Sequence, residues 1–192
     1  MNLSPLYNVT EAISLGHLYF VRHGETFWNV ENKICGQTDS PLTKRGHAQA
    51  IATGERIRSL GLQIDQVLSS PLSRAYETAQ HIAEINGFPL QVEPRLIEQN
   101  FGKYEGTPRD GKEFAADKQN FICSYGGGET MLHLAHRIYS LLDDITADEE
   151  HTYLLVAHNG ISRVVYSYFH DMTNEEYADY GIPNADILEL TF

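Results

Sequence analysis

The chain has 192 residues, and its 14 Lys and Arg against 26 Asp and Glu give a net charge of −12 with histidine neutral. Its length suits one domain, and 42% hydrophobic with 21% charged residues is ordinary for a globular protein, which excludes general disorder. No apolar run approaches the ~20 residues of a membrane-spanning helix. A surface this acidic also argues against nucleic acid and membranes as partners.

Apolar residues alternate along the chain between short continuous runs, typical of buried strands, and stretches with a helical period. In chain order they predict a strand at 17–21, a helix at 43–60, a strand at 66–70, a helix at 72–85, a strand at 90–92, a short helix at 111–118, a helix at 129–145, a strand at 153–157, a helix at 161–169 and a strand at 187–191. Thr43 is a suitable N-cap for the first helix, and Gly61 a suitable end.

This alternation predicts an α/β fold, a three-layer α/β/α sandwich with a central, mostly parallel sheet. We expect one domain over residues 17–192, preceded by an N-terminal extension at residues 1–16. The extension lacks Lys and Arg, and no sustained apolar segment follows, so we expect no signal peptide. The two cysteines, Cys35 and Cys123, are too few for a disulfide framework, and we expect reduced thiols in a cytoplasmic protein.

The charge is unevenly distributed. Residues 138–192 contain eleven acidic residues and one basic residue, Arg163, whereas residues 1–137 have a net charge of only −2. An anionic substrate would therefore need a local basic cluster that works against the overall field. The candidates for that cluster lie mostly in the first half of the chain.

Polar side chains follow the predicted strands where each strand ends. They are Arg22 and His23, the turn leading to Arg74, Glu98 a few residues after the third strand, and His158. Ligands of parallel sheets bind beyond the carboxyl ends of the strands, so we expect these side chains to converge.

The segment from Arg22 to Thr26 places a histidine in a tight turn beside an arginine. Neutral histidine is a nucleophile, and glycine lets the backbone approach a ligand closely. Further motifs follow in order: Trp28-Asn29, Gly36-Gln37, Asp39, Pro41-Leu42-Thr43, Gly46, Ser69 to Ala75, Thr78-Ala79, Glu98, Phe101-Gly102, Glu105-Gly106, Gly128-Glu129-Thr130, Val156-Ala157-His158 and Asn184-Ala185. With this set, the sequence resembles the histidine phosphatase superfamily, the phosphoglycerate mutase-like proteins, over about residues 17–192.

The resemblance implies that His23 attacks phosphorus and becomes phosphohistidine. It implies that Glu98 protonates the leaving oxygen and then activates water. The groups expected to bind the phosphoryl oxygens are Arg22, Arg74 and His158. Further contacts to the substrate are expected from Asn29, the Gly36 backbone, Thr26 and Asn159.

Elementary chemistry agrees with these roles. A phosphate dianion needs compensating positive charge, which two arginines and a protonated His158 would supply, whereas His23 must be neutral to attack. We therefore expect the pKa values of the two histidines to be split. An alkoxide leaving group needs a proton, so we expect a raised pKa for Glu98, with Glu105 as the next candidate.

We expect no cofactor and no metal ion. His133 and His136 lie three residues apart on a predicted helix, but no further ligand completes a metal site, so we interpret them as helix surface. We interpret the glycine run 126–128 as a hinge before a helix whose first turn contains Glu129, where a negative charge complements the helix dipole.

The resemblance includes both phosphatases and mutases. Cofactor-dependent mutases carry an insertion with paired arginines after the acid, but here the segment between Glu98 and the glycine run is short and has no Arg-Arg pair. Phe101 also replaces the tyrosine of the mutases, and Asn159 replaces a frequent glycine. We therefore favour a hydrolase acting on a small-molecule phosphate ester. The alternatives are a phosphoglycerate mutase and a binding module that has lost catalysis.

Overall fold

The computed structural model describes residues 16–192, so the extension expected at residues 1–16 lies, except for its last residue, outside the described residues. Five strands form one sheet in the order β3-β2-β4-β1-β5. They are β1 (His17–Arg22), β2 (Gln66–Ser69), β3 (Leu90–Val92), β4 (Tyr153–Ala157) and β5 (Ile187–Thr191). All neighbouring pairs are parallel except β5, which is antiparallel to β1. The mostly parallel sheet is confirmed.

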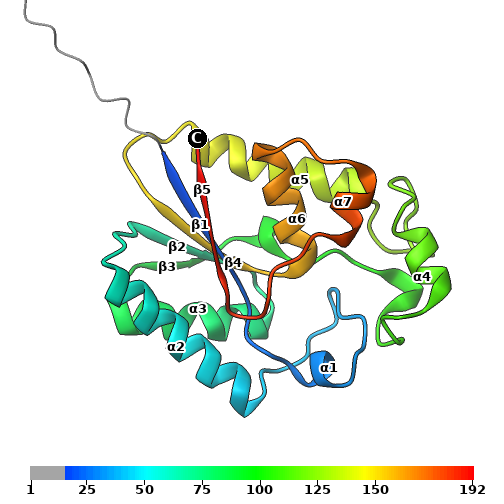
Figure 1. Ribbon diagram of the computed structural model, residues 1–192, viewed down its shortest axis with the longest axis horizontal. Coiled ribbons are helices and arrows are strands. Elements are labelled where there is room, and N and C mark those ends of the chain that lie inside the picture. Colours follow the sequence, from blue (N-terminus) through cyan, green and yellow to red (C-terminus); the bar gives the residue numbers. More distant parts are fainter. Residues whose placement is uncertain (1–15) are drawn as a thin grey trace, which may run out of the picture.

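Helices cover both faces of the sheet (Figure 1). α2 (Lys44–Leu60) and α3 (Ser73–Asn86) pack on one face, and α5 (Met131–Thr146) and α6 (Asn159–Phe169) on the other. The connections contain the shorter elements α1 (Phe27–Val30), η1 (Pro94–Leu96), η2 (Gly102–Tyr104), α4 (Lys112–Asp117) and α7 (Asn174–Asp179). No helix in the described part of the chain is long and apolar enough to cross a membrane.

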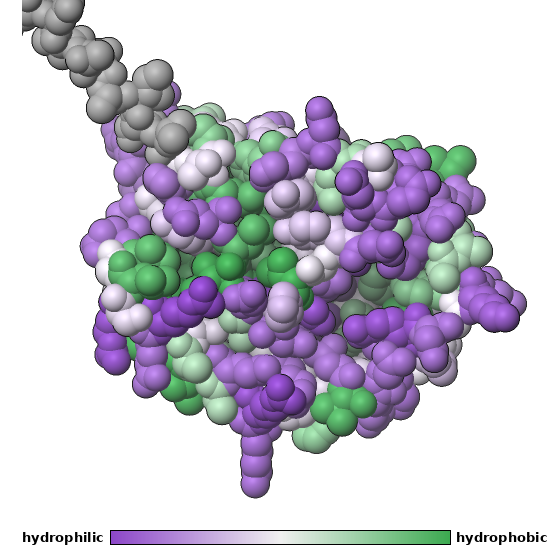
Figure 2. Space-filling model, in the orientation of Figure 1, coloured by the Kyte–Doolittle hydropathy of each residue, from purple (hydrophilic) through white to green (hydrophobic). Residues whose placement is uncertain are grey.

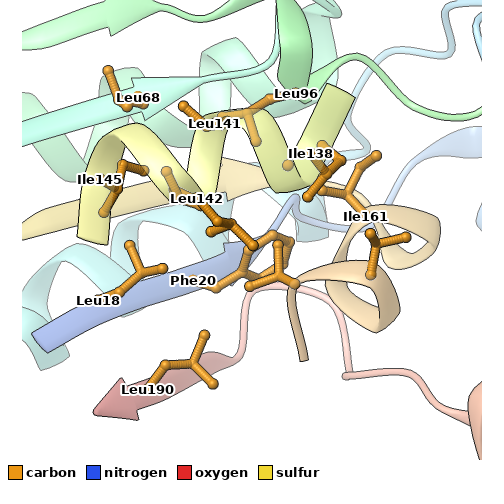
Figure 3. Packing of buried hydrophobic residues seen from close by; sticks show 14 of the residues in the cluster. Leu18, Phe20, Leu68, Leu96, Ile138, Leu141, Leu142, Ile145, Ile161 and Leu190 are labelled. Atoms are coloured by element: carbon orange, nitrogen blue, oxygen red, sulfur yellow. The ribbon is translucent and has the colours of Figure 1, made fainter. Parts of the chain in front are cut away.

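The apolar runs of the central strands are continuous because both strand faces are buried. In β1, Leu18 and Phe20 belong to the core under α5 and α6, whereas Tyr19 and Val21 belong to the core under α2 and α3. Figure 3 shows the first of these cores, with Leu18 and Phe20 close to Leu142 of α5. The surface is mostly hydrophilic on the face seen in Figure 2.

The ends of the long helices follow the expected signals. The Thr43 side chain accepts the backbone hydrogen of Gly46 at 3.0 Å, and Gly61 closes α2 with a positive φ of 67°. The expectation for α5 was wrong at its start. Thr130 is its N-cap, so Glu129 precedes the helix and pairs instead with Arg137 at 2.8 Å.

Candidate active site

His23 follows the end of β1 and is 5% exposed. Its Nδ1 lies 2.7 Å from the carbonyl oxygen of Gly24, so Nδ1 carries the hydrogen and the Nε2 lone pair is free. Burial, and after it the charge of Arg74, holds the pKa of His23 well below its usual range. The imidazole is therefore in the neutral form that a nucleophile requires.

The structure requires glycine at position 24 for the packing of the backbone, and not for the expected close approach to a ligand. A Cβ at this position would lie 2.4 Å from the carbonyl oxygen of Gly46, in the first turn of α2. The glycine therefore lets α2 start directly against the turn that carries His23. The Asn184 side chain stabilises the same turn by donating to the His23 carbonyl at 2.8 Å.

His158 follows β4 and is completely buried beside His23, with a ring-to-ring distance of 5.2 Å. Its Nε2 lies 2.7 Å from Ser70 Oγ, and its Nδ1 has no hydrogen-bond partner among residues 16–192. Burial, followed by Arg74, lowers its pKa well below the usual range. The expected pKa split is therefore wrong for this site, because burial and the neighbouring arginine disfavour a charge on either imidazole.

The two expected arginines lie near the histidine pair, and the charge of each helps to lower the pKa of both imidazoles. Arg74, 1% exposed, donates to the carbonyl oxygens of Thr38 at 3.1 Å and Gly36 at 2.7 Å. Arg22 donates to the Ile182 carbonyl at 2.7 Å, and burial lowers its pKa to about 10. The Nε of each guanidinium is buried without a partner among the described residues. Both arginines thus keep a hydrogen-bond donor that an anion could use.

Glu98 is 4% exposed and lies after η1. Its Oε1 accepts the backbone hydrogen of Gln99 at 2.9 Å, and its Oε2 accepts that of Gly160 at 3.0 Å. Burial raises the pKa of Glu98 in spite of these two hydrogen bonds. Glu98 is therefore a carboxyl group with a raised pKa, as predicted from the sequence.

Glu105, the second candidate for the acid, has a different environment. Its carboxylate accepts four backbone hydrogens at 3.1–3.2 Å, from Gly36, Gln37, Thr38 and Phe101. These contacts shape the loop whose carbonyl oxygens hold Arg74. Both backbone groups of Gly36 are therefore engaged within the protein, its N–H by Glu105 and its carbonyl by Arg74.

Of the three other residues expected to contact the substrate, two line the active-site cavity described below and one does not. Thr26 is fully buried, and its side chain caps α1 by accepting the Asn29 backbone hydrogen at 3.2 Å, away from the cavity. Asn29 and Asn159 do line the cavity. Asn159 Oδ1 accepts the Ile182 backbone hydrogen at 3.1 Å, which joins the start of α6 to the segment after α7.

A cavity of about 520 Å³ lies beyond the carboxyl ends of β1 and β4, and Arg74, His158 and Thr26 are not among the residues that line it. In Figure 1, α1, α4 and α7 lie together on that side of the molecule. Five of the lining residues were predicted as site residues from the sequence: Arg22, His23, Asn29, Glu98 and Asn159. The sequence did not predict Ile34, Cys35, Phe114, Arg109, Lys118, Arg163 or the 178–183 segment as part of the site. The isolated position of Arg163 in the acidic segment 138–192 was a readable signal.

The family profile described as histidine phosphatase superfamily, branch 1, matches residues 18–192. The chain belongs to the histidine phosphatase superfamily. A curated relative, the probable phosphoglycerate mutase GpmB of Yersinia pestis, is 40% identical over 133 residues, which are 66% of this chain. Those residues span only 61% of the relative's length.

Solved structures of the superfamily are similar over most of the chain. A mycobacterial glucosyl-3-phosphoglycerate phosphatase is 26% identical with a TM-score of 0.81, and the match covers 92% of this chain and 90% of that one. A putative alpha-ribazole-5'-P phosphatase from Escherichia coli, 24% identical with a TM-score of 0.80 over the same shares, has the same fold.

Proposed function

We propose that this protein is a phosphomonoester hydrolase that works through a phosphohistidine on His23. The observation that carries the proposal is the state of that imidazole. Its Nδ1 hydrogen is bound by Gly24, its pKa is lowered, and it lines a cavity that also contains a buried carboxyl group and Arg22. A neutral, oriented nucleophile among cations is what phosphoryl transfer requires.

In the first half of the reaction, His23 Nε2 attacks phosphorus. The N–P bond forms while the bond from phosphorus to the ester oxygen breaks, and that oxygen takes the proton of Glu98. The raised pKa of Glu98 keeps this proton available. Arg22 and Arg74, through Nε–H groups that have no partner among residues 16–192, stabilise the charge on the equatorial oxygens.

In the second half, Glu98, now a carboxylate, removes a proton from water. The water oxygen attacks phosphorus, the N–P bond breaks, and its electron pair returns to Nε2. Inorganic phosphate leaves, and both His23 and Glu98 regain their starting forms. His158 Nδ1, which has no partner among residues 16–192, is available to a phosphoryl oxygen, and a bound dianion would favour its protonation.

Rapid mixing with a labelled phosphate ester followed by an alkaline quench tests the proposal. We expect a base-stable, acid-labile phosphoenzyme that the His23→Ala variant does not form. The matched control is His133→Ala, an exposed histidine of α5 outside the cavity, which should form the phosphoenzyme normally. Label retained by His23→Ala would overturn the assignment.

A mutase is the second candidate, and the 40% identity to the probable phosphoglycerate mutase favours it. In a mutase, the phosphoryl group would return from His23 to a substrate hydroxyl instead of water. We place the phosphatase first because the segment between Glu98 and the glycine run is short and has no Arg-Arg pair. The fold shared with the glucosyl-3-phosphoglycerate phosphatase over 92% of this chain is consistent with it. With 3-phosphoglycerate and a trace of 2,3-bisphosphoglycerate, we expect inorganic phosphate, whereas 2-phosphoglycerate without phosphate release would identify a mutase.

A further inference from the structure

Ser70 carries a buried hydroxyl group beside the proposed centre that the mechanism above does not use. The residue follows the end of β2, is fully buried, and donates its backbone hydrogen to the Val156 carbonyl of β4 at 3.0 Å. Because β2 and β4 are parallel, with Ser69 opposite Val156, the residues that follow the two strands lie at the same edge of the sheet. This register brings Ser70 Oγ to 2.7 Å from His158 Nε2.

The hydrogen of the Ser70 hydroxyl group has one acceptor within residues 16–192. Oγ itself accepts the backbone hydrogen of Leu72 at 3.3 Å, in the turn that leads into α3. The neighbouring Ser69 hydroxyl donates to the Ser70 carbonyl and does not contact Oγ. The remaining partner is His158 Nε2. Since a buried hydroxyl hydrogen without an acceptor is unfavourable, the geometry requires Ser70 to donate and Nε2 to accept.

The other ring nitrogen of His158 leads to the same assignment. A neutral imidazole has one hydrogen, so an Nε2 that accepts leaves that hydrogen on Nδ1. The lowered pKa of His158 keeps the ring neutral, and its side chain does not cap α6. Nδ1 is buried without a partner among the described residues. An N–H group at this position is a donor that only a bound group can satisfy.

The position of the ring relative to His23 identifies that bound group. The centroids of the two imidazoles lie 5.2 Å apart. A phosphoryl group on His23 Nε2 would be close enough for one of its oxygens to reach a donor on the neighbouring ring. Anionic oxygens accept hydrogen bonds and are repelled by a lone pair. The tautomer with hydrogen on Nδ1 is therefore the one that can bind a phosphoryl oxygen.

We propose that Ser70 is a positioning residue that fixes His158 in the tautomer with hydrogen on Nδ1, so that a neutral imidazole donates a hydrogen bond to the phosphoryl group. The proposal rests on the function proposed above, in which that group occupies His23. The donor is then present before the substrate binds, and the ring needs no second proton. Arg74 follows four positions after Ser70, so one short segment prepares two of the groups expected to hold phosphoryl oxygens.

Nitrogen-15 NMR of the unmodified protein tests the tautomer directly. Protonated and unprotonated ring nitrogens resonate far apart, and the signals of His158 are those that disappear in His158→Asn. At neutral pH we expect a protonated Nδ1 and an unprotonated Nε2. His23 is the internal reference, because the Gly24 carbonyl holds the hydrogen on its Nδ1. A hydrogen on His158 Nε2, alone or together with one on Nδ1, would overturn the proposal.

Variants of two adjacent buried serines assign the tautomer to the Ser70 hydroxyl. In Ser70→Ala we expect part of the molecules to carry the hydrogen on Nε2, and the Kd for inorganic phosphate to rise roughly three- to tenfold. Ser70→Thr, which keeps a hydroxyl group, should recover most of the affinity. Ser69→Ala is the matched control, since it loses a buried hydroxyl that donates at 2.9 Å to a carbonyl and not to His158. It should keep both the tautomer and the affinity.

The tautomer and the hydrolase function can fail separately. An Nδ1–H tautomer that depends on Ser70, in a protein that hydrolyses no ester, would support the positioning role and reject the hydrolase. A phosphoenzyme on His23 together with an Nε2–H tautomer of His158 would do the reverse. Unchanged tautomer and phosphate affinity in Ser70→Ala would also contradict the positioning role, with thermal unfolding checking that each variant is folded.

Discussion

Glu98 and Gly160 lie 62 positions apart in the chain, and each constrains the position of the other. The carboxylate accepts the Gly160 backbone hydrogen at 3.0 Å, and a Cβ at position 160 would lie only 2.3 Å from Glu98 Oε1. The first turn of α6 and the proposed acid therefore fit together only when residue 160 has no side chain. This requirement explains a glycine in a helix, where alanine is otherwise favoured by about 1 kcal/mol.

Gly160→Ala should damage the proposed acid without removing it. We expect the added methyl group to displace the Glu98 carboxyl and to slow phosphoenzyme formation from an alkyl phosphate by tenfold or more, because general acid catalysis depends on geometry. Quench-flow measurement of the phosphoenzyme checks this. Gly111→Ala is the matched control, because the nearest atom to its Cβ, the Pro108 oxygen, would be 3.4 Å away. Equal rates in the two variants would contradict the prediction.

Glu98→Gln should show a strong dependence on the leaving group. An alkoxide leaves poorly without a proton, whereas nitrophenolate leaves readily. We expect phosphoenzyme formation to fall roughly 100- to 10,000-fold with an alkyl phosphate, and far less with nitrophenyl phosphate. Single-turnover kinetics measures formation separately from hydrolysis of the intermediate. An equal loss for both substrates would show that Glu98 is not the acid.

Most of the layered fold was predictable from the sequence, because buried parallel strands give continuous apolar runs and long helices carry their own end signals. The antiparallel direction of β5 was not, since a short terminal strand fits either edge of a sheet in either direction. α1 and α7, of four and six residues, were missed, whereas α4, which also has six, was predicted at 111–118; helices this short have too few turns to give a reliable period. Their capping boxes, at Thr26 with Asn29 and Thr173 with Glu176, were the readable signals.

The site was predictable where chemistry fixes the residue type, as at His23 and Glu98. It was less predictable where tertiary packing determines the protonation state or the partners of a side chain. The neutral state of His158 depends on its complete burial beside Arg74, which is a tertiary property. Likewise, Glu105 looked like a second acid, but three of its four partners are backbone hydrogens from 67–69 positions earlier in the chain, which no local pattern reveals.

Glu105→Ala should weaken the loop that holds Arg74. The change removes the acceptor of four backbone hydrogens, so we expect the free energy of unfolding to fall by about 1–3 kcal/mol and kcat/KM to fall with it. Urea unfolding and steady-state kinetics on one preparation measure both quantities. The control Glu55→Ala, at an exposed position of α2, should leave both within error. Unchanged stability in Glu105→Ala would refute this structural role.

The buried histidines should make the protein less stable in mild acid. The folded-state pKa values of His23 and His158 are lowered, so the stability that they contribute is fully present above the unfolded-state pKa of about 6.5. Below it, the unfolded chain binds protons that the folded chain does not, and stability falls. We therefore expect His158→Asn to flatten the decline in unfolding free energy between pH 7.5 and 5.5. The exposed control His136→Asn should keep the original slope.

Activity should not depend on a divalent metal ion. The charge that such ions neutralise in other phosphoryl-transfer sites would here be met by Arg22 and Arg74, whose Nε–H groups have no partner in the described part of the chain. We expect the same rate of phosphate release with and without excess EDTA. A loss of activity that magnesium or zinc restores would contradict both this prediction and the charge assignment behind it.

The position of β1 also sets the order in which the site can be completed during synthesis. The strand that leads to His23 is made near the beginning, but its two neighbours, β4 and β5, are Tyr153–Ala157 and Ile187–Thr191. The segment just before β5 then closes on the turn, since Ala185 donates its backbone hydrogen to the Arg22 carbonyl at 2.8 Å. A growing chain therefore holds its nucleophile on a strand with no neighbour until β4 has been made, and with only one neighbour until β5 follows. Ribosome-bound fragments ending before residue 184 should therefore be inactive.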